Sequence, residues 1–177
     1  ASTASPTTMP YPRAAVSVAV RCEYEAEAYY LLVQRGKEPN LGRWSFPGGK
    51  LELGETALQG GKRELGEETK FLNHHEQQVE LQWHPGTVAT QDSILVDKDG
   101  KTQYHFLIAI CFAQIKIPNN NNNVGGVVKS LPKVIPADDA ADAKWWKVQD
   151  LMGADLTPGL IERIHRTEHM YQRGVLS

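Results

Sequence analysis

Three glutamates fall within five positions of the sequence "RELGEETK", which covers residues 63–70. On a helix, residues three and four apart share a face, so Glu64, Glu67 and Glu68 are expected to lie together. Clustered carboxylates, with a backbone carbonyl, suit Mg²⁺ or Mn²⁺ better than Zn²⁺. A solvated acidic face on a surface helix is the other interpretation of such a run. The upstream stretch "SFPGGKLELGE" (45–55) favours a metal site, because its glycines let backbone carbonyls approach a ligand closely.

The stretch from residue 49 to residue 71, "GKLELGETALQGGKRELGEETKF", resembles the signature of the Nudix hydrolase family. In that signature a Gly, a Glu, an Arg-Glu pair, an aliphatic residue, a Glu-Glu pair, a Gly and an aliphatic residue follow one another with fixed gaps. The matching positions are Gly49, Glu55, Arg63, Glu64, Leu65, Glu67, Glu68 and Phe71. Lys70 departs from the pattern, because the family has a glycine there that ends the helix in a backbone geometry other residues adopt at some cost.

The resemblance implies a hydrolase that uses Mg²⁺, or Mn²⁺, to cleave the diphosphate of a nucleoside diphosphate joined to another group. It implies a set of metal ligands: Glu64, Glu67, Glu68 and the main-chain carbonyl of Gly48. The general base would be one of the three glutamates or a carboxylate from a later loop, whose candidates are Asp138, Asp139 and Asp142. Simple surface charge is the other interpretation of those three aspartates.

Five further residues have roles that the resemblance or the residue type suggests. Glu55 and Arg63 are expected to form a supporting ion pair that orients the metal ligands. Arg35 could reach a substrate phosphate with its planar guanidinium, or could pair at the surface. Trp44 and Phe46 could flank a nucleotide base, or could pack under the glycine loop.

The substrate expectation comes from two segments outside the signature. "RGKEPNLGRWSFPGG" (35–49) and "DDAADAKWW" (138–146) most resemble the ADP-ribose pyrophosphatase-like branch, which would yield AMP and ribose 5-phosphate. One alternative is a pyrophosphatase of nucleoside triphosphates, including oxidised ones. Another is a Nudix-fold regulator that binds a nucleotide without turning it over. Substrate pockets in the family lie outside the signature, so the signature does not choose among these functions.

Elements to position these residues can be predicted along the chain. The family implies an α/β/α sandwich with a mixed sheet between helices. The alternation of Val16, Val18 and Val20 with smaller or polar residues predicts a half-buried strand. A hairpin is predicted over 93–115, with positive φ angles at Asp99-Gly100. The remaining predictions are strands at 28–35, 78–83, 87–90 and 143–148, a helix over 56–69, and a helix that starts at Thr157-Pro158 and ends near Gln172.

The domain prediction is a disordered lead-in over 1–12 and a single domain over 13–177, interrupted by a flexible Asn-rich loop over 118–130. With 19 basic and 21 acidic residues, the chain gives no electrostatic case for a nucleic-acid polymer or an anionic membrane as partner. The expected partner is a small nucleotide, and a homodimer is left open. Cys22 and Cys111 are expected to be buried thiols, which fits the cytoplasm. The Ser/Thr-rich lead-in leaves a mitochondrial or plastid transit-peptide remnant as the alternative.

Overall fold

The computed structural model describes residues 11–71, 79–116 and 130–176. Residues 1–10 of the predicted lead-in and nearly all of the predicted Asn-rich loop lie outside this part of the chain. The elements, in chain order, are β1 (Arg13–Tyr24), β2 (Glu27–Arg35), β3 (Trp44–Ser45), β4 (Gly48–Lys50), α1 (Ala57–Thr69), β5 (Glu80–Val96), β6 (Thr102–Lys116), β7 (Ala140–Lys147), a 3-10 helix (Val148–Gly153) and α2 (Leu160–Gln172).

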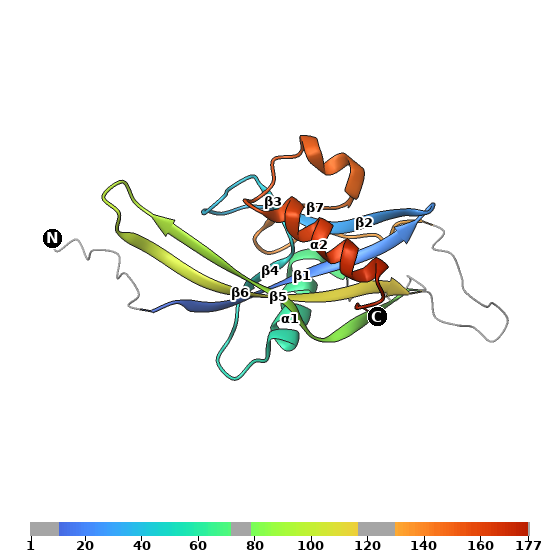
Figure 1. Ribbon diagram of the computed structural model, residues 1–177, viewed down its shortest axis with the longest axis horizontal. Helices are drawn as coiled ribbons and strands as arrows, with labels where there is room; N and C mark the ends of the chain where they lie inside the picture. The colour runs from blue at the N-terminus through green and yellow to red at the C-terminus, as the bar shows by residue number, and fades with distance from the viewer. Residues whose placement is uncertain (1–10, 72–78, 117–129, 177) are drawn as a thin grey trace.

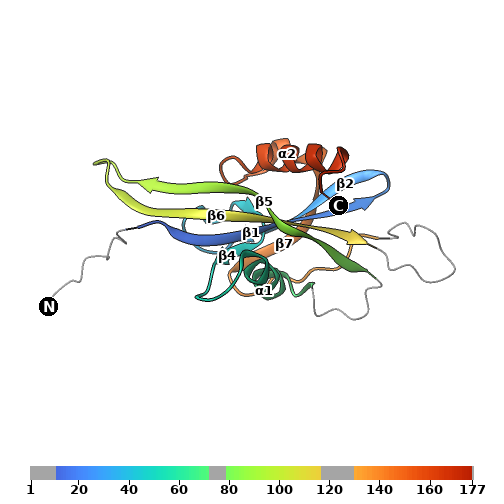
Figure 2. The same cartoon turned by 60° about the horizontal axis from the view of Figure 1, so that its bottom comes forward.

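The strands form one mixed sheet in the order β3-β2-β1-β6-β5, with β4 beside β1 and β7 beside β2. β1 and β6 run parallel, whereas the other strand pairs of the described chain are antiparallel. Figure 2 shows α1 on one face of the sheet and α2 on the other. The expected α/β/α sandwich is confirmed. None of the helices in the described ranges has the length and apolar character that a bilayer crossing requires.

β1 is buried on both faces, so the prediction of a half-buried strand was wrong. Val16, Val18 and Val20 pack on the α1 side, and Ala19 packs on the α2 side. Alanine looked like a solvent-side residue in the sequence pattern, but it is small enough to sit beneath a covering helix. β1 is therefore a central strand, and the short β4 is aligned along it through the pairs Ser17–Gly48 and Val16–Gly49.

α1 starts and ends close to its predicted bounds. Thr56 caps it with a capping box, in which the Thr56 side chain accepts from the Gln59 N–H and the Gln59 side chain accepts from the Thr56 N–H. Gly61 faces β1, where a Cβ atom would lie 3.0 Å from Val18 Cγ2, so the helix packs unusually close to the sheet. Lys70 ends the helix in the left-handed region, with φ 50° and ψ 16°, and donates its N–H to the Gly66 carbonyl. Lysine here adopts a conformation that glycine commonly adopts at the end of a helix.

The predicted hairpin is present, but its details differ (Figure 1). The two short strands predicted before it join its first arm in one strand, β5. β5 keeps its pairing to β6 through register shifts after Trp83, Thr87 and Leu95. At the tip only Gly100 has a positive φ of 79°, whereas Asp99 does not. Asp97 shapes the tip instead, because its carboxylate accepts from the N–H groups of residues 99 and 101. The hairpin also leaves apolar side chains exposed: Ile94, Leu95, Val96 and Leu107.

α2 begins at Leu160, three residues after the predicted cap at Thr157, because Gly159 adopts a positive φ of 72° that interrupts the turn. A buried polar cluster fixes the helix to the sheet. Arg21 of β1 donates two hydrogen bonds to Glu168, at 2.8 and 2.9 Å, and Tyr30 of β2 donates a third at 3.1 Å. Cys22 and Cys111 are free and buried, as predicted.

Candidate active site

The glycine turn brings the backbone directly against the side chains of α1. The Gly48 N–H donates to Glu68 Oε2 at 2.9 Å. At Gly49, a Cβ atom would fall on the carboxylate of Glu64. A side chain at that position would require the Glu64 carboxylate to move. The same close approach makes the Gly48 carbonyl a neighbour for any ion held by these carboxylates. The consecutive glycines therefore form one wall of the site, and α1 forms the other.

Glu64 and Glu68 are buried, at 9% and 7% exposure, whereas Glu67 lies nearer the solvent. Burial is the main cause that raises the pKa of Glu68 to about 8, and the negative charge of Glu64 adds to it. Burial also raises the pKa of Glu64, against the influence of Arg63. Two carboxylates with raised pKa values in one site are typical of a place where a cation or a proton is handled.

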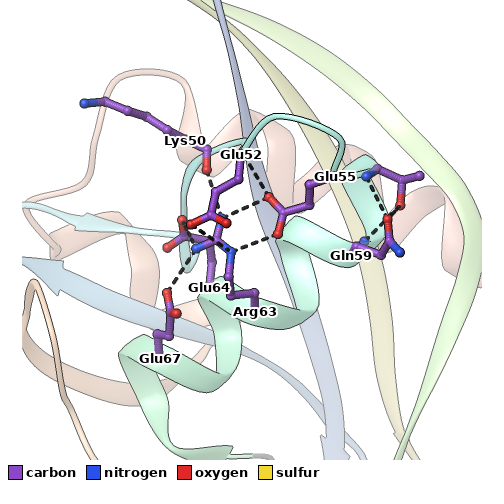
Figure 3. A network of polar contacts seen from close by, with 8 residues as sticks. Lys50, Glu52, Glu55, Gln59, Arg63, Glu64 and Glu67 are labelled. Atoms are coloured by element: carbon purple, nitrogen blue, oxygen red, sulfur yellow. Dashed lines mark hydrogen bonds and ion pairs between the residues drawn. The ribbon is translucent and has the colours of Figure 1, made fainter.

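Arg63 is the centre of the polar network drawn in Figure 3. Its Nε and Nη2 atoms donate to the two oxygens of Glu55, at 2.8 and 3.1 Å. Nη2 also donates to the main-chain carbonyl of Lys50 at 3.0 Å. Glu55 in turn accepts from the Glu52 N–H at 2.9 Å, which fixes the loop before α1. The expected ion pair is thus present and ties the loop to the helix.

The remaining amino group of Arg63 points at the glutamates. Nη1 donates to Glu64 Oε1 at 2.9 Å and to Glu67 Oε2 at 3.0 Å (Figure 3). Nothing in the residue pattern distinguished this contact from the pairing with Glu55. The one available signal was spacing, since Glu67 lies one helical turn after Arg63 and Glu64 is its neighbour.

The chemistry of the donor set fits a hard divalent cation. The three glutamates and the Gly48 carbonyl offer only oxygen atoms, which Mg²⁺ and Mn²⁺ prefer. Within the described ranges, however, no three carboxylate, imidazole or thiol groups are already gathered as a ligand cluster. Hydrogen bonds explain this arrangement, because Arg63 holds Glu64 and Glu67 while the Gly48 N–H holds Glu68. Each glutamate uses one carboxylate oxygen in these bonds, so an ion at this site would compete with Arg63 and the Gly48 N–H for these side chains.

The segment before β7 is attached to the C-terminal end of α1. The Ile135 and Ala137 N–H groups donate to the carbonyls of Thr69 and Glu68, at 2.9 and 2.8 Å. This brings Asp138 close enough for its charge to raise the pKa values of Glu64 and Glu68.

The other two aspartates of that loop have partners of their own. Asp139 forms an ion pair with Lys37, and Asp142 accepts from the Ala143 N–H at 2.8 Å. A Cβ atom on Gly36 would lie 2.5 Å from the Asp139 carbonyl, so the two loops are in close contact. We did not predict this contact from the sequence, where the glycine of "QRG", Gly36, is the one visible sign of it. Asp138 is therefore the aspartate of the three whose charge acts on the glutamates.

Arg35, Trp44 and Phe46 were the further candidates for contact with a substrate. Arg35 donates Nε–H to the Pro39 carbonyl at 2.7 Å, and its charge lowers the pKa of Glu68. Trp44 and Phe46 are buried in the core on the α2 side. The Trp44 ring packs on Trp146 with centroids 5.2 Å apart. The structure thus places Arg35 near the carboxylates and the two aromatic residues in the packing under the loop.

Comparisons with solved structures show the same fold at low identity. The NUDIX domain of Shewanella oneidensis NrtR, solved with ADP ribose, superposes with a TM-score of 0.64 at 19% identity, covering 95% of this chain and 94% of that one. A C. elegans Ap4A hydrolase gives 0.62 at 18%, with 90% and 98% covered. A bifunctional NMN adenylyltransferase/ADP ribose pyrophosphatase from Francisella tularensis, complexed with AMP and a Mn ion, gives 0.58 at 23%, with 91% and 43% covered.

Sequence comparison points the same way. No curated protein matches the chain. The family model described as NUDIX domain matches residues 11–166, which include the glycine turn, α1 and the segment that carries Asp138. A match over so much of the chain, joined to the sandwich fold and the glutamate site, shows that the chain belongs to the Nudix domain family.

Proposed function

We propose that this protein is a divalent-metal-dependent hydrolase that cleaves the diphosphate of a nucleoside diphosphate joined to another group. The observation that carries the proposal is the pair of buried carboxylates, Glu64 and Glu68, packed directly against the backbone of Gly48 and Gly49. A buried acidic pair beside an open backbone turn is costly for the fold and is explained by a bound cation. Glu67 and the Gly48 carbonyl would complete the ligand set.

The bound Mg²⁺ or Mn²⁺ would supply neutralisation of the phosphate charge and a bound water of lowered pKa. The chain's own residues would orient the reaction. Glu55 and Arg63 hold the loop against α1 and would thereby orient the ligand carboxylates. The general base would be one of the glutamates, or Asp138, whose charge already acts on Glu64 and Glu68. Arg35 lies near Glu68 and would meet a phosphate with its guanidinium.

The proposed substrate is ADP-ribose, with AMP and ribose 5-phosphate as products. Two sequence segments, 35–49 and 138–146, support this choice, and the structure brings them together through the Lys37–Asp139 ion pair. Two of the similar structures were solved with ADP ribose or AMP. Pyrophosphohydrolysis of nucleoside triphosphates, including oxidised ones, is the alternative reaction. Regulation by nucleotide binding without turnover is the alternative from another class.

Product analysis tests the proposal. Purified protein with Mg²⁺ is offered ADP-ribose, NADH, a dinucleoside polyphosphate and several nucleoside triphosphates, and the products are separated by chromatography. AMP formed from ADP-ribose well above the other substrates is the expected result. Activity confined to nucleoside triphosphates would exclude ADP-ribose as the substrate and support the alternative reaction. No turnover on the panel, with Mg²⁺ and ADP-ribose both bound, would favour the regulator.

The Glu68→Gln variant links the site to the reaction. It keeps the size of the side chain and removes its charge, so turnover should fall on the order of 100-fold or more if Glu68 is a ligand or the base. Glu80→Gln is the matched control, since Glu80 is exposed at the start of β5. A well-folded Glu68→Gln protein that turns over like Glu80→Gln would exclude Glu68 from the site.

Two further proposals concern the protein as a whole. A homodimer through the exposed apolar end of the β5–β6 hairpin would cover Ile94, Leu95, Val96 and Leu107. Light scattering coupled to gel filtration tests it, and a monomer at high concentration would exclude it.

The cytoplasm is the proposed location, with mitochondrion or plastid as the alternative, and microscopy of the full-length tagged protein distinguishes them.

A further inference from the structure

Arg63 contacts two different groups of acceptors with different atoms of one guanidinium. Nε and Nη2 bond Glu55 and the Lys50 carbonyl, on the side of the loop before α1. Nη1 bonds Glu64 and Glu67, on the side of the site (Figure 3). A supporting ion pair needs only the first set of bonds. The second set occupies one oxygen of each of two carboxylates, Glu64 and Glu67, that the proposed function assigns to a metal ion.

The second set has a clear electrostatic role. Glu64 and Glu67 repel each other, and burial disfavours the charged form of Glu64. The Nη1 group offsets both effects with two charge-assisted hydrogen bonds of 2.9 and 3.0 Å. Arg63 is itself only about one-quarter exposed, at 24% of its side chain, so the attraction is less screened than in a fully exposed pair. The Arg63 guanidinium therefore offsets the negative charge of Glu64 and Glu67, as a bound metal ion would.

The Arg63 guanidinium and a metal ion cannot both bind the same carboxylate oxygens of Glu64 and Glu67 at once. An ion bound by Glu64 Oε1 and Glu67 Oε2 would sit where Nη1 now donates, and like charges at such distances repel strongly. The bonds to Glu55 and the Lys50 carbonyl point away from the site and need not break. Arg63 can therefore release the glutamates with Nη1 while it stays attached to the loop with Nε and Nη2.

We propose that Arg63 is a resident counter-ion that exchanges with the metal. It holds Glu64 and Glu67 until a divalent cation displaces Nη1, so it stabilises the metal-free protein and weakens metal binding. This inference rests on the proposed function, because it requires that the site bind a divalent cation. It explains why the carboxylates of this site are not gathered as a ligand cluster among the described residues.

The test compares Arg63→Met with Glu55→Gln, with Mn²⁺ as the probe and isothermal titration calorimetry as the readout. Glu55→Gln weakens the attachment to the loop and leaves Nη1 in place. Arg63→Met removes the attachment and the cation together. We expect Arg63→Met to bind Mn²⁺ roughly three- to tenfold more tightly than Glu55→Gln, because two charge-assisted bonds no longer have to be given up. Equal or weaker binding by Arg63→Met would overturn the exchange and leave Arg63 as a positioning residue only.

Thermal unfolding gives a second readout on the same variants. In EDTA, Arg63→Met should unfold at a lower temperature than Glu55→Gln, because Glu64 and Glu67 have lost their cation. In saturating Mn²⁺ the difference should shrink, because the metal replaces Nη1. A difference that is the same with and without Mn²⁺ would contradict the exchange.

A third measurement uses the wild-type chain, so that it does not depend on a variant that folds. Arginine side-chain NMR follows the Nε and Nη signals of Arg63 during a titration with diamagnetic Mg²⁺. The Nη1 signals should change while the Nε signal, which reports the bond to Glu55, persists. An unchanged Nη1 at saturating Mg²⁺ would refute the exchange alone. A wild-type protein that binds neither Mn²⁺ nor Mg²⁺ would instead refute the proposed function, and the exchange with it.

Discussion

Replacement of Lys70 by glycine should stabilise this protein, although it removes a whole side chain. Lys70 ends α1 with φ 50° and ψ 16°, in the left-handed region. A residue with a Cβ atom adopts this conformation at a cost of roughly 1–2 kcal/mol, which glycine avoids. Glycine gives back about 0.4–1 kcal/mol, because it makes the unfolded chain more flexible. The net gain in unfolding free energy lies between about 0 and about 1.6 kcal/mol, with a midpoint of about 0.8 kcal/mol. That midpoint corresponds to about 2 °C in Tm for a chain of this size.

Urea unfolding followed by circular dichroism measures this gain, in EDTA to exclude an effect of metal binding. Lys62→Gly is the matched control, since Lys62 is an exposed lysine inside the same helix. There glycine should cost about 1 kcal/mol, because it lacks the helix preference of lysine. The two variants should thus shift the midpoint in opposite directions. A Lys70→Gly protein destabilised as much as Lys62→Gly would show that the left-handed helix end carries no strain.

Three further predictions follow from the site and its helix. Gly49→Ala should weaken Mn²⁺ binding by about tenfold or more in calorimetry, because the new Cβ displaces the Glu64 carboxylate. Gly86→Ala is the control and should leave Mn²⁺ binding unchanged, because its new Cβ meets nothing within 4 Å. Equal Mn²⁺ affinities of the two variants would contradict the close approach of Gly49 to Glu64. In EDTA, the buried Glu68 carboxyl has a pKa of about 8, so its contribution to stability is present below about pH 4.3 and is lost as the pH rises toward about 8. Glu68→Gln should therefore flatten the fall in Tm between about pH 5 and about pH 8, whereas identical slopes would refute the raised pKa. Thr56→Ala should cost about 1 kcal/mol in urea unfolding through loss of the capping box, and an unchanged midpoint would exclude that role.

Fixed spacing made α1 and its acids predictable from the sequence. The positions of Glu64 and Glu68 relative to the glycine turn follow from helix geometry once the turn and the helix start are known. For Arg63, the pairing with Glu55 was predicted, but the contacts with Glu64 and Glu67 were not. Glu64 is its neighbour in sequence and Glu67 lies one turn later, so both compete with Glu55 for the same guanidinium. Which atoms of the guanidinium meet which acid depends on the loop after β4, and the residue types do not determine that path.

Other differences arise from tertiary context. Ala19 was interpreted as a solvent-side residue, but it lies under α2, because an alternation of small and large residues also suits a strand covered on both faces. Thr157 looked like a helix cap, yet the positive φ of Gly159 delays α2 until Leu160. The contact between Gly36 and Asp139 joins segments about 100 residues apart, and no local pattern reports such a pairing.

The two hydrogen bonds from Ile135 and Ala137 to the end of α1 have an evolutionary consequence. They fix Asp138 relative to Glu68 by a route that does not pass through the chain between Lys116 and Ser130. A change in the length of that connection need not shift Asp138, because the two hydrogen bonds that set its position lie after the connection. A change of length in that connection is therefore compatible with a constant placement of Asp138 beside Glu68 in this architecture.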